Sequence, residues 1–253
     1  MTRLSNIFNS DQKLLSVYFT AGYPKLDDTV KIISELEKSG VDFLEIGLPF
    51  SDPLADGPVI QHSSTIAIEN GMTAKLLFEQ LRDIRKSVKI PLLIMGYFNS
   101  MLQFGIEAFL QKCSETGIDG LIIPDLPLDV YVSEYEPVFK KYDLPLIFLV
   151  TPQTSEERIR EIDSASNAFI YLVSTAAITG NSADFGQKQE DYFKRIADLK
   201  LKNPCVAGFG IHDKKTFEAA TRFTSGAIVG SAFIRNLEQN GISSIADFIS
   251  KFN

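Results

Sequence analysis

The stretch GLIIPDLPLDVYVSEYEPVFKKYDLPLIFLVTPQTSEERIREIDSASNAFIYLV, residues 120–173, determines which fold this chain can adopt. Three of its short runs, 120–124, 146–150 and 168–173, are apolar almost throughout, as is typical of parallel strands covered on both faces. Between them, 130–142 and 155–164 place apolar residues three or four positions apart, which predicts amphipathic helices. The stretch therefore predicts consecutive strand–helix–strand units in a parallel sheet.

The same alternation continues on both sides of this stretch. Further strands are expected at Leu15–Thr20, Phe43–Gly47, Pro91–Met95, Cys205–Gly208 and Ala227–Gly230, and further helices at 27–39, 73–87, 104–116, 188–200 and 213–223. Eight such strands without a linker predict an α/β fold: a single (β/α)8 TIM barrel over residues 1–253, with an extra N-terminal helix. The alternative is a doubly wound sheet of six strands, but GFGIHDK lacks the third glycine of a dinucleotide fingerprint.

The composition excludes several classes of protein. With 25 basic and 32 acidic side chains, the net charge of −7 argues against nucleic-acid binding. No apolar run approaches the roughly 18 residues of a membrane span, and MTRLSNIFNSDQK does not resemble a signal peptide. We therefore expect a cytoplasmic protein that does not bind membranes. The two histidines, His62 and His212, are too few for a multi-histidine metal site, so no metal is expected.

Two intervals between expected strands are longer than the others. The interval after the second strand contains SDPLADGPVIQ, and the interval after the sixth contains STAAITGNSADFGQ. Loops that follow barrel strands form the catalytic face, so long loops after strands 2 and 6 point to function. The alternative is a tolerated insertion without a role.

Glu45 lies inside the second expected strand, FLEIG. Strand alternation places it on the face opposite to Leu44 and Ile46, so it points into the barrel if this aliphatic pair faces the helices. A buried carboxyl group is costly unless it is paired or protonated. Glu45 is therefore either a general acid/base whose pKa is raised by apolar walls, or a carboxylate that caps the barrel interior through hydrogen bonds.

Asp56 lies in LADGP, in the loop that follows this strand. An Asp-Gly pair alone is most often a turn, but both carboxyl groups can overhang one pocket. Two acids in different environments can hold different protonation states, so one site can run acid and base steps together.

Glycines follow the last two strands, at Gly208-Phe209-Gly210 and at Gly230-Ser231. Loops after strands seven and eight, together with a helix N-terminus, form the recurrent phosphate site of these barrels. No lysine or arginine lies at either loop tip, so we expect backbone amides, the helix dipole and the Ser231 hydroxyl to bind the phosphate.

Aromatic and aliphatic side chains lie at or just past several strand ends. Each alone would be read as a core residue. Together they predict an apolar pocket above the barrel, lined by Tyr18, Tyr97, Ile122 and Tyr171.

With Glu45 just upstream, GLPFSDPLADGPVIQ resembles the alpha subunit family of tryptophan synthase. Six further segments occur in the family's order and cover nearly the whole chain: YFTAGYP, MGYFNSMLQFG, IPDLP, YLVSTAAITG, GFGIH and GAIVGSA. Two positions depart from the family pattern. Ala177 replaces a glycine of the strand-six loop, and His212 follows GFGI where a serine is common, so it either binds the phosphate when charged or caps a helix.

The resemblance implies a lyase that cleaves indole-3-glycerol phosphate to indole and D-glyceraldehyde 3-phosphate in tryptophan biosynthesis. It implies that Glu45 protonates indole C3, that Asp56 takes or stabilises the indole N–H proton, that Gly180 binds the phosphate and that Thr179 takes part in loop closure. It also implies a beta subunit that receives the indole and uses pyridoxal phosphate, in an alpha2beta2 heterotetramer, while this chain binds no cofactor.

The residue inventory agrees with this chemistry. Retro-aldol enzymes usually stabilise a carbanion with a Schiff-base lysine or a metal, and none of the eight expected strands contains a lysine. The leaving group must therefore stabilise itself, as C3-protonated indole does. Two alternatives stay open: an enzyme for another indole or sugar phosphate, such as an isomerase, and a barrel subunit that only regulates a partner.

Overall fold

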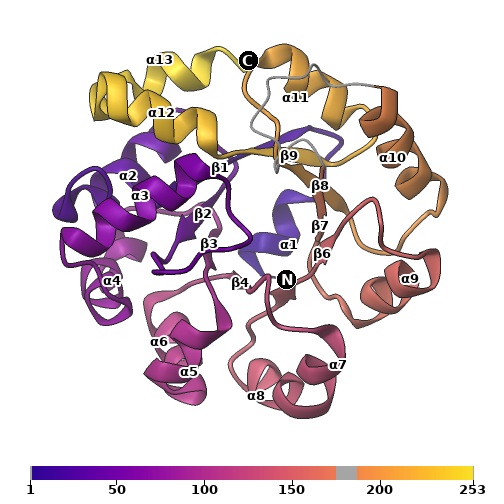
Figure 1. Cartoon of the computed structure of the whole chain (residues 1–253), viewed down its shortest axis with the longest axis horizontal. Coiled ribbons are helices and arrows are strands. Elements are labelled where there is room, and N and C mark those ends of the chain that lie inside the picture. Colours follow the sequence, from indigo (N-terminus) through magenta and orange to yellow (C-terminus); the bar gives the residue numbers. More distant parts are fainter. Residues whose placement is uncertain (1, 175–186, 253) are drawn as a thin grey trace.

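The strands of the chain close into one parallel barrel in the computed structural model, which describes residues 2–174 and 187–252. The first strand, β1 (Leu14–Thr20), pairs in parallel with the last, β9 (Gly226–Val229), so that Leu14 lies opposite Gly226. Viewed down the barrel, the helices form a ring outside the strands, except for the N-terminal helix, which lies across the centre of the barrel (Figure 1). Pairing between the first and last strands excludes the doubly wound alternative, and the predicted (β/α)8 barrel is confirmed.

The fifth barrel strand is interrupted at Phe148. The run expected at 146–150 forms two short strands, β5 (Leu146–Ile147) and β6 (Leu149–Val150), which are the two ends of the sheet order. The Phe148 carbonyl still accepts a hydrogen bond from the backbone N–H of Tyr171, at 2.9 Å. The nine strand segments therefore correspond to the eight expected strands.

The remaining predicted strands and helices are present, with boundaries that shift by a few residues, and the structure adds helices at 58–69, 98–104 and 245–250 that were not predicted. The other strands are β2 (Phe43–Gly47), β3 (Leu92–Met95), β4 (Gly120–Ile122), β7 (Ile170–Val173) and β8 (Cys205–Gly208). The helices are α1 (Arg3–Ile7), α2 (Thr29–Lys38), α3 (Pro58–Glu69), α4 (Ala74–Leu81), α5 (Phe98–Phe104), α6 (Ile106–Thr116), α7 (Leu128–Val130), a π-helical turn (Tyr131–Tyr135), α8 (Glu136–Lys141), α9 (Glu156–Ala165), α10 (Gln187–Asp198), α11 (Lys214–Thr221), α12 (Ser231–Asn240) and α13 (Ile245–Ser250), with 3-10 turns at Leu26–Asp28, Ile84–Lys86 and Ile242–Ser244.

The long segment after β2 contains a helix that the periodicity did not predict. Residues 48–57 form the loop, and α3 begins at Pro58, directly after Gly57. Proline suits the first helical position because its fixed φ matches the helix and its missing N–H would have no partner there. The segment expected after strand six lies mainly at 175–186, so Ala177, Thr179 and Gly180 lie outside the described residues.

Alternating side chains divide the apolar core into two layers. From β2, Phe43 packs into the cluster inside the barrel, whereas Leu44 and Ile46 pack into the cluster between strands and helices. Glu45 lies in register between Tyr18 of β1 and Leu93 of β3, which are both members of the inner cluster. The predicted inward orientation of Glu45 is therefore confirmed.

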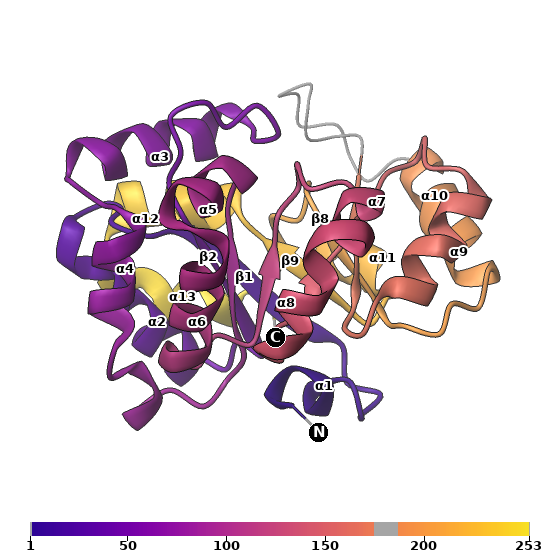
Figure 2. The same ribbon diagram turned by 90° about the horizontal axis from the view of Figure 1, so that it is seen from below.

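Helix α1 lies at the amino-terminal end of the barrel strands, opposite to the loop that leads into α3 (Figure 2). Its Leu4 is buried within the inner cluster, and the Phe8 ring packs 5.8 Å from the ring of Phe169. The extra N-terminal helix predicted from the sequence is confirmed, and it covers this end of the barrel.

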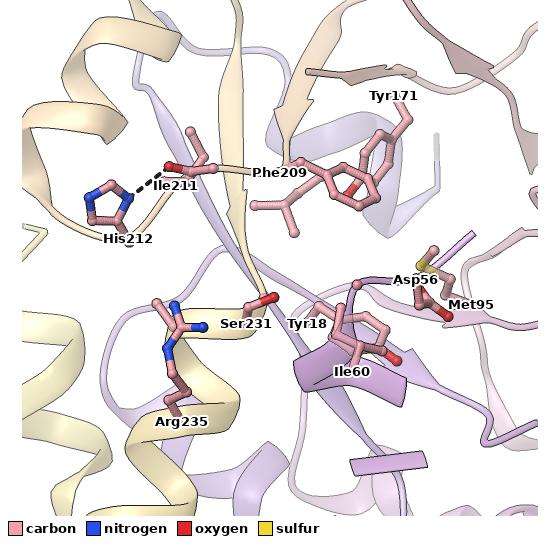
Figure 3. A pocket seen from close by; sticks show the side chains of 15 residues that line it. Tyr18, Asp56, Ile60, Met95, Tyr171, Phe209, Ile211, His212, Ser231 and Arg235 are labelled. Carbon is pink, nitrogen blue, oxygen red and sulfur yellow. Dashed lines mark hydrogen bonds between the residues drawn. The ribbon is translucent and has the colours of Figure 1, made fainter. Parts of the chain in front are cut away.

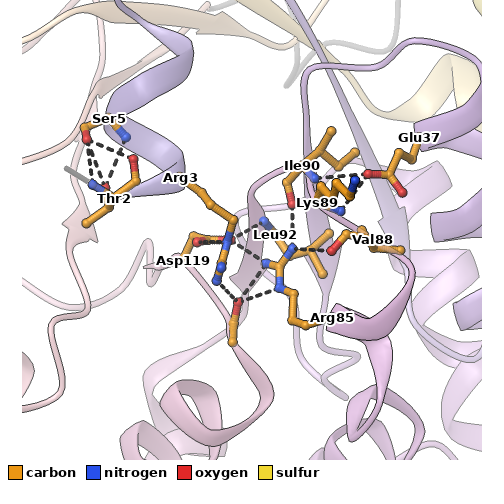
Figure 4. Close-up of polar contacts among 11 residues, drawn as sticks. Thr2, Arg3, Ser5, Glu37, Arg85, Val88, Lys89, Ile90, Leu92 and Asp119 are labelled. Atoms are coloured by element: carbon orange, nitrogen blue, oxygen red, sulfur yellow. Dashed lines mark hydrogen bonds and ion pairs between the residues drawn. The ribbon is translucent and has the colours of Figure 1, made fainter.

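A charged network fastens α1 to the barrel (Figure 4). Asp119, whose side chain is 5% exposed, accepts hydrogen bonds from Arg3 Nε at 2.8 Å, from Arg85 and from the backbone N–H of Leu92. Arg3 and Arg85 also both donate to the carbonyl oxygen of Gly117. One buried carboxylate thus joins the N-terminal helix to the segments before β3 and β4.

Candidate active site

Glu45 is fully buried near the carboxyl end of β2. Among the described residues, neither oxygen of its carboxyl group has a hydrogen-bond partner. Burial without a partner penalises the charged form, which raises the pKa of Glu45 to about 8. This carboxyl group is therefore mainly protonated at neutral pH and can act as an acid.

Asp56 is held by Tyr97, which precedes α5. The Tyr97 hydroxyl donates to Asp56 Oδ2 at 3.1 Å and accepts from the backbone N–H of Ala55 at 2.9 Å. The Tyr97 ring also stacks on Phe50 of the same loop, with 5.0 Å between ring centroids. Burial raises the pKa of Asp56 to about 6, although the hydrogen bond from Tyr97 opposes this rise. Asp56 is therefore mainly ionised at neutral pH, in contrast to Glu45.

Two buried tyrosines lie within the electrostatic reach of both carboxyl groups. Burial raises the pKa of Tyr18 and of Tyr171 far above the usual value, and the charges of Glu45 and Asp56 add to this effect at both rings. Both phenols therefore stay protonated, and each lies close enough to Glu45 and Asp56 for a charge on either carboxylate to oppose its ionisation.

Glycines at two strand ends make room for these tyrosines. A Cβ at Gly47 would lie 2.1 Å from the Tyr18 hydroxyl oxygen, and a Cβ at Gly208 would lie 2.1 Å from that of Tyr171. Both distances are far below van der Waals contact. The absence of a side chain at Gly208 therefore leaves room for the Tyr171 side chain.

A pocket opens at this end of the barrel and encloses about 700 Å³, including its mouth. Figure 3 shows Asp56 and Met95 on one side and His212 and Arg235 on the other. The lining residues are Tyr18, Asp56, Gly57, Ile60, Met95, Tyr171, Phe209, Gly210, Ile211, His212, Ile228, Gly230, Ser231, Ala232 and Arg235.

The side of the pocket opposite Asp56 has the features of an anion site. Phe209 and Gly210 both adopt positive φ, of 69° and 79°, which is uncommon for a residue with a Cβ such as Phe209. Helix α12 begins at Ser231 without a side-chain cap, so its first N–H groups are left for a ligand. Ser231 and Ala232 line the pocket at this helix end.

Some of the predicted site residues line this pocket and others do not. The predicted residues that line it are Tyr18, Asp56, Tyr171, Phe209, Gly210, Gly230 and Ser231. Glu45, Tyr97, Ile122 and Gly208 are not among the lining residues. Tyr97 instead positions Asp56, and Ile122 is fully buried in the inner cluster.

Sequence reasoning missed one basic residue. No lysine or arginine was expected near the phosphate site, but Arg235 lines the pocket. It lies four residues after Ser231, which places both side chains on one face of α12. The four-residue spacing between Ser231 and Arg235 was the signal in the sequence that could have indicated Arg235 as a pocket residue. His212 also lines the pocket and does not cap α11, because Asp213 is the capping residue.

Within residues 2–174 and 187–252, no group of three or more His, Cys, Asp or Glu side chains is arranged to hold a metal ion. None of the helices described there is both long and apolar enough to cross a membrane.

Together, the fold and the pocket define a barrel enzyme with two buried carboxyl groups of different protonation beside an apolar site suited to a small anionic molecule. The family model of the tryptophan synthase alpha chain matches residues 4–251. The chain belongs to the tryptophan synthase alpha chain family. It is accordingly a lyase component of the tryptophan synthase complex in tryptophan biosynthesis, and membership of this family implies a beta-chain partner.

Relatives and solved structures agree with this assignment. The tryptophan synthase alpha chain of Flavobacterium psychrophilum is 63% identical over 251 residues and covers 99% of both chains. The alpha chain of Phocaeicola vulgatus is 54% identical over 94% of this chain and 93% of its own. The alpha subunit structure from Legionella pneumophila matches with a TM-score of 0.90 at 31% identity, covering 100% of this chain and 97% of that one. A Mycobacterium tuberculosis tryptophan synthase chain matches with a TM-score of 0.90 at 28% identity, over 99% and 96% of the two chains.

Proposed function

We propose that this chain cleaves indole-3-glycerol phosphate to indole and D-glyceraldehyde 3-phosphate in a retro-aldol reaction. The observation that supports it most directly is the separation of the two acids, with a pKa of about 8 for Glu45 and about 6 for Asp56. Near neutral pH this separation supplies one proton donor and one carboxylate, which is the pairing that acid–base catalysis requires.

Glu45 is the proposed proton donor. Its proton goes to C3 of the indole ring, and the bond between C3 and the glycerol chain then breaks, with its electron pair returning to the ring. The ionised Glu45 takes up the proton of the adjacent hydroxyl group as this carbon becomes the aldehyde. Because Glu45 is buried and does not line the pocket, its side chain must turn toward the substrate for these transfers.

Asp56 is the proposed partner of the indole N–H group. Protonation at C3 places positive charge on the ring nitrogen, and an ionised carboxylate stabilises this charge or accepts the proton. Its free oxygen, Oδ1, is buried and has no hydrogen-bond partner among the described residues. This oxygen is therefore available to a ligand, whereas Oδ2 is held by Tyr97.

The rest of the pocket suits the two ends of the substrate. Tyr18 and Tyr171 supply apolar ring surface for the indole, and Gly210, Gly230 and Ser231 supply backbone and hydroxyl donors for the phosphate. Gly180 in phosphate binding and Thr179 in loop closure remain part of the proposal, although both lie outside the described residues.

The proposed assembly is an alpha2beta2 heterotetramer in the cytoplasm, in which this chain acts as one domain over residues 1–253 and binds no cofactor. The beta chain would use pyridoxal phosphate to join the released indole to serine. Leu54, in the loop that holds Asp56, is 90% exposed, and an apolar side chain there suits contact with a partner. Cys113 and Cys205 are both free, which suits a reducing compartment.

The decisive experiment is to incubate the chain with indole-3-glycerol phosphate, with and without a tryptophan synthase beta chain, and to follow the release of indole. We expect Glu45→Gln to abolish indole release. Glu35→Gln is the control, because Glu35 is a surface residue on α2 that pairs with Lys38. Consumption of substrate without indole would favour an isomerase. Full tryptophan formation by the complex with Glu45→Gln would favour a purely regulatory subunit.

A further inference from the structure

Two basic side chains lie on the pocket wall away from the catalytic carboxyl groups. His212 lies between β8 and α11, and Arg235 lies in the second turn of α12. In Figure 3 both are on the side of Ser231, across the pocket from Asp56. The two come from consecutive loop–helix units, which the parallel pairing of β8 with β9 places side by side.

The backbone and one ring nitrogen of His212 are held in place. Its N–H donates to Thr216 Oγ1 at 3.0 Å, and its Nδ1 lies 2.8 Å from the carbonyl oxygen of Gly210. Because a carbonyl oxygen only accepts hydrogen bonds, Nδ1 must bear the proton. Nε2 is then a donor only when the ring is charged, so an acceptor-only anion can bind there only to the imidazolium form.

The charged groups around this ring come from three parts of the chain. Asp213 Oδ2 lies 3.7 Å from Nε2. Lys214 and Lys215 follow on α11, and Arg235 and Asp56 are the charged groups of the pocket lining. A phosphate at the start of α12 would add an anion on the side of the pocket that holds His212 and Arg235.

Arg235 has no carboxylate partner within the part of the chain that the structure describes. Five other arginines of this acidic protein do pair with carboxylates, namely Arg3, Arg85, Arg158, Arg160 and Arg222. Arg195 donates instead to the carbonyl oxygen of Pro152, and Arg82 forms no such pair among the described residues, but neither lines this pocket. An arginine at the rim of a pocket, one helical turn after Ser231, is placed to pair with a bound anion instead.

We propose that His212 and Arg235 bind the phosphate group of the substrate from its outer side and set the preference of the pocket for a dianionic phosphate monoester. This inference rests on the proposed function, because it places the phosphate end of the substrate beside Gly210 and Ser231. Backbone amides alone would hold any small anion. The two cations add charge complementarity, which distinguishes a dianion from a carboxylate or a neutral sugar.

The test uses glycerol 3-phosphate as a probe and calorimetric titration of the full-length chain, so that binding is measured without catalysis. We expect Arg235→Met to weaken binding about tenfold at low salt, and less at high salt because screening reduces the contribution of an exposed charge. Arg235→Lys should restore part of the loss. The control is Arg82→Met, which removes an exposed arginine from the end of α4, outside this pocket.

His212→Asn keeps a donor for the Gly210 carbonyl and removes Nε2. We expect about threefold weaker binding, because the variant has no nitrogen at the position of Nε2 that can donate to the phosphate. With substrate, both variants should raise KM and leave kcat unchanged, and thermal unfolding checks that they fold.

The outcomes separate this inference from the proposed function. If both variants bind the probe within about twofold of the wild type at low salt, the inference is overturned. It is also overturned if the wild type does not bind the probe. If the variants lose binding as expected but the wild type releases no indole, the phosphate role of His212 and Arg235 stands and the proposed reaction fails.

Discussion

The hydroxyl group of Tyr97 donates a hydrogen bond to Asp56 Oδ2 at 3.1 Å and accepts one from the backbone N–H of Ala55 at 2.9 Å. A single side chain at the end of β3 therefore fixes both the backbone and the carboxylate of the loop that follows β2. From the sequence, Tyr97 was expected to line the indole pocket. In the structure it is not among the lining residues, and its hydroxyl group positions Asp56.

Replacing Tyr97 with phenylalanine should lower kcat/KM about tenfold at neutral pH, because a hydrogen bond to a charged group is lost. That bond lowers the pKa of Asp56, so its removal should move the acidic limb of the pH profile to higher pH. The measurement is indole formation against pH. The matched control is Tyr142→Phe, which removes a surface bond from tyrosine to Glu107. An unchanged acidic limb in Tyr97→Phe would contradict the positioning role.

The wild-type pH profile should be bell-shaped. Activity requires Asp56 ionised and Glu45 protonated, so kcat/KM should rise with pH through about 6 and fall again through about 8. Asp56→Asn should cause a large loss of activity and remove the rise on the acidic side. A profile of kcat/KM that stays flat across this range would exclude the assigned protonation states.

Burial of Glu45 should also make the protein less stable as the pH rises. Its pKa is raised from 4.5 to about 8, so the folded chain holds a proton that the unfolded chain has released. The stabilising effect of this proton is complete below pH 4.5 and is lost as the pH rises toward 8. Each pKa unit corresponds to about 1.4 kcal/mol, so the change amounts to several kcal/mol.

Glu45→Gln should remove this dependence, because glutamine does not titrate. Urea denaturation of the wild type and of Glu45→Gln at a series of pH values gives the difference directly. The free energies of unfolding should differ increasingly in favour of the variant as the pH rises. Parallel curves would mean that Glu45 is not protonated in the folded chain.

Loss of Asp119 should destabilise the barrel without affecting the chemistry. Asp119→Ala leaves Arg85, whose side chain is only 19% exposed, without its carboxylate, and we expect a cost of about 3 kcal/mol. Arg3→Met should cost about 1 kcal/mol or less, because the Arg3 side chain is 45% exposed. Urea denaturation gives both values. Equal losses in the two variants, or a fall in kcat of the folded protein, would contradict this purely structural role.

Local patterns were sufficient for much of the fold. Alternation within FLEIG placed Glu45 inside the barrel, because successive strand residues point to opposite faces. The same logic failed for α3, since SDPLADGP is rich in turn-forming residues and conceals a helix that begins at Pro58. It also did not show the break at Phe148, because the run LIFLV is uniformly apolar.

Contacts between distant segments could not be read from these patterns. Tyr97 and Asp56 are 41 residues apart, and nothing in either motif indicates the hydrogen bond between them. Gly208 was expected at the phosphate, but the ring of Tyr171 lies against it. Arg235 is an ordinary surface position of α12 until the helix packs against β1 and α3, with the loop that follows β8 on the other side of the pocket wall.

By itself, the sequence determined the order of strands and helices, the inward face of Glu45 and the resemblance to a family, because periodicity and motifs depend on neighbouring residues. Only the tertiary structure decided which groups meet and how deeply each is buried. Closure of the barrel buries Glu45 more deeply than Asp56 and gives only Asp56 a hydrogen-bond donor, and this difference separates their pKa values. Pairing of β8 with β9 places His212 and Arg235 on one side of the pocket, and pairing of β9 with β1 adds Tyr18 and Asp56 to the same lining.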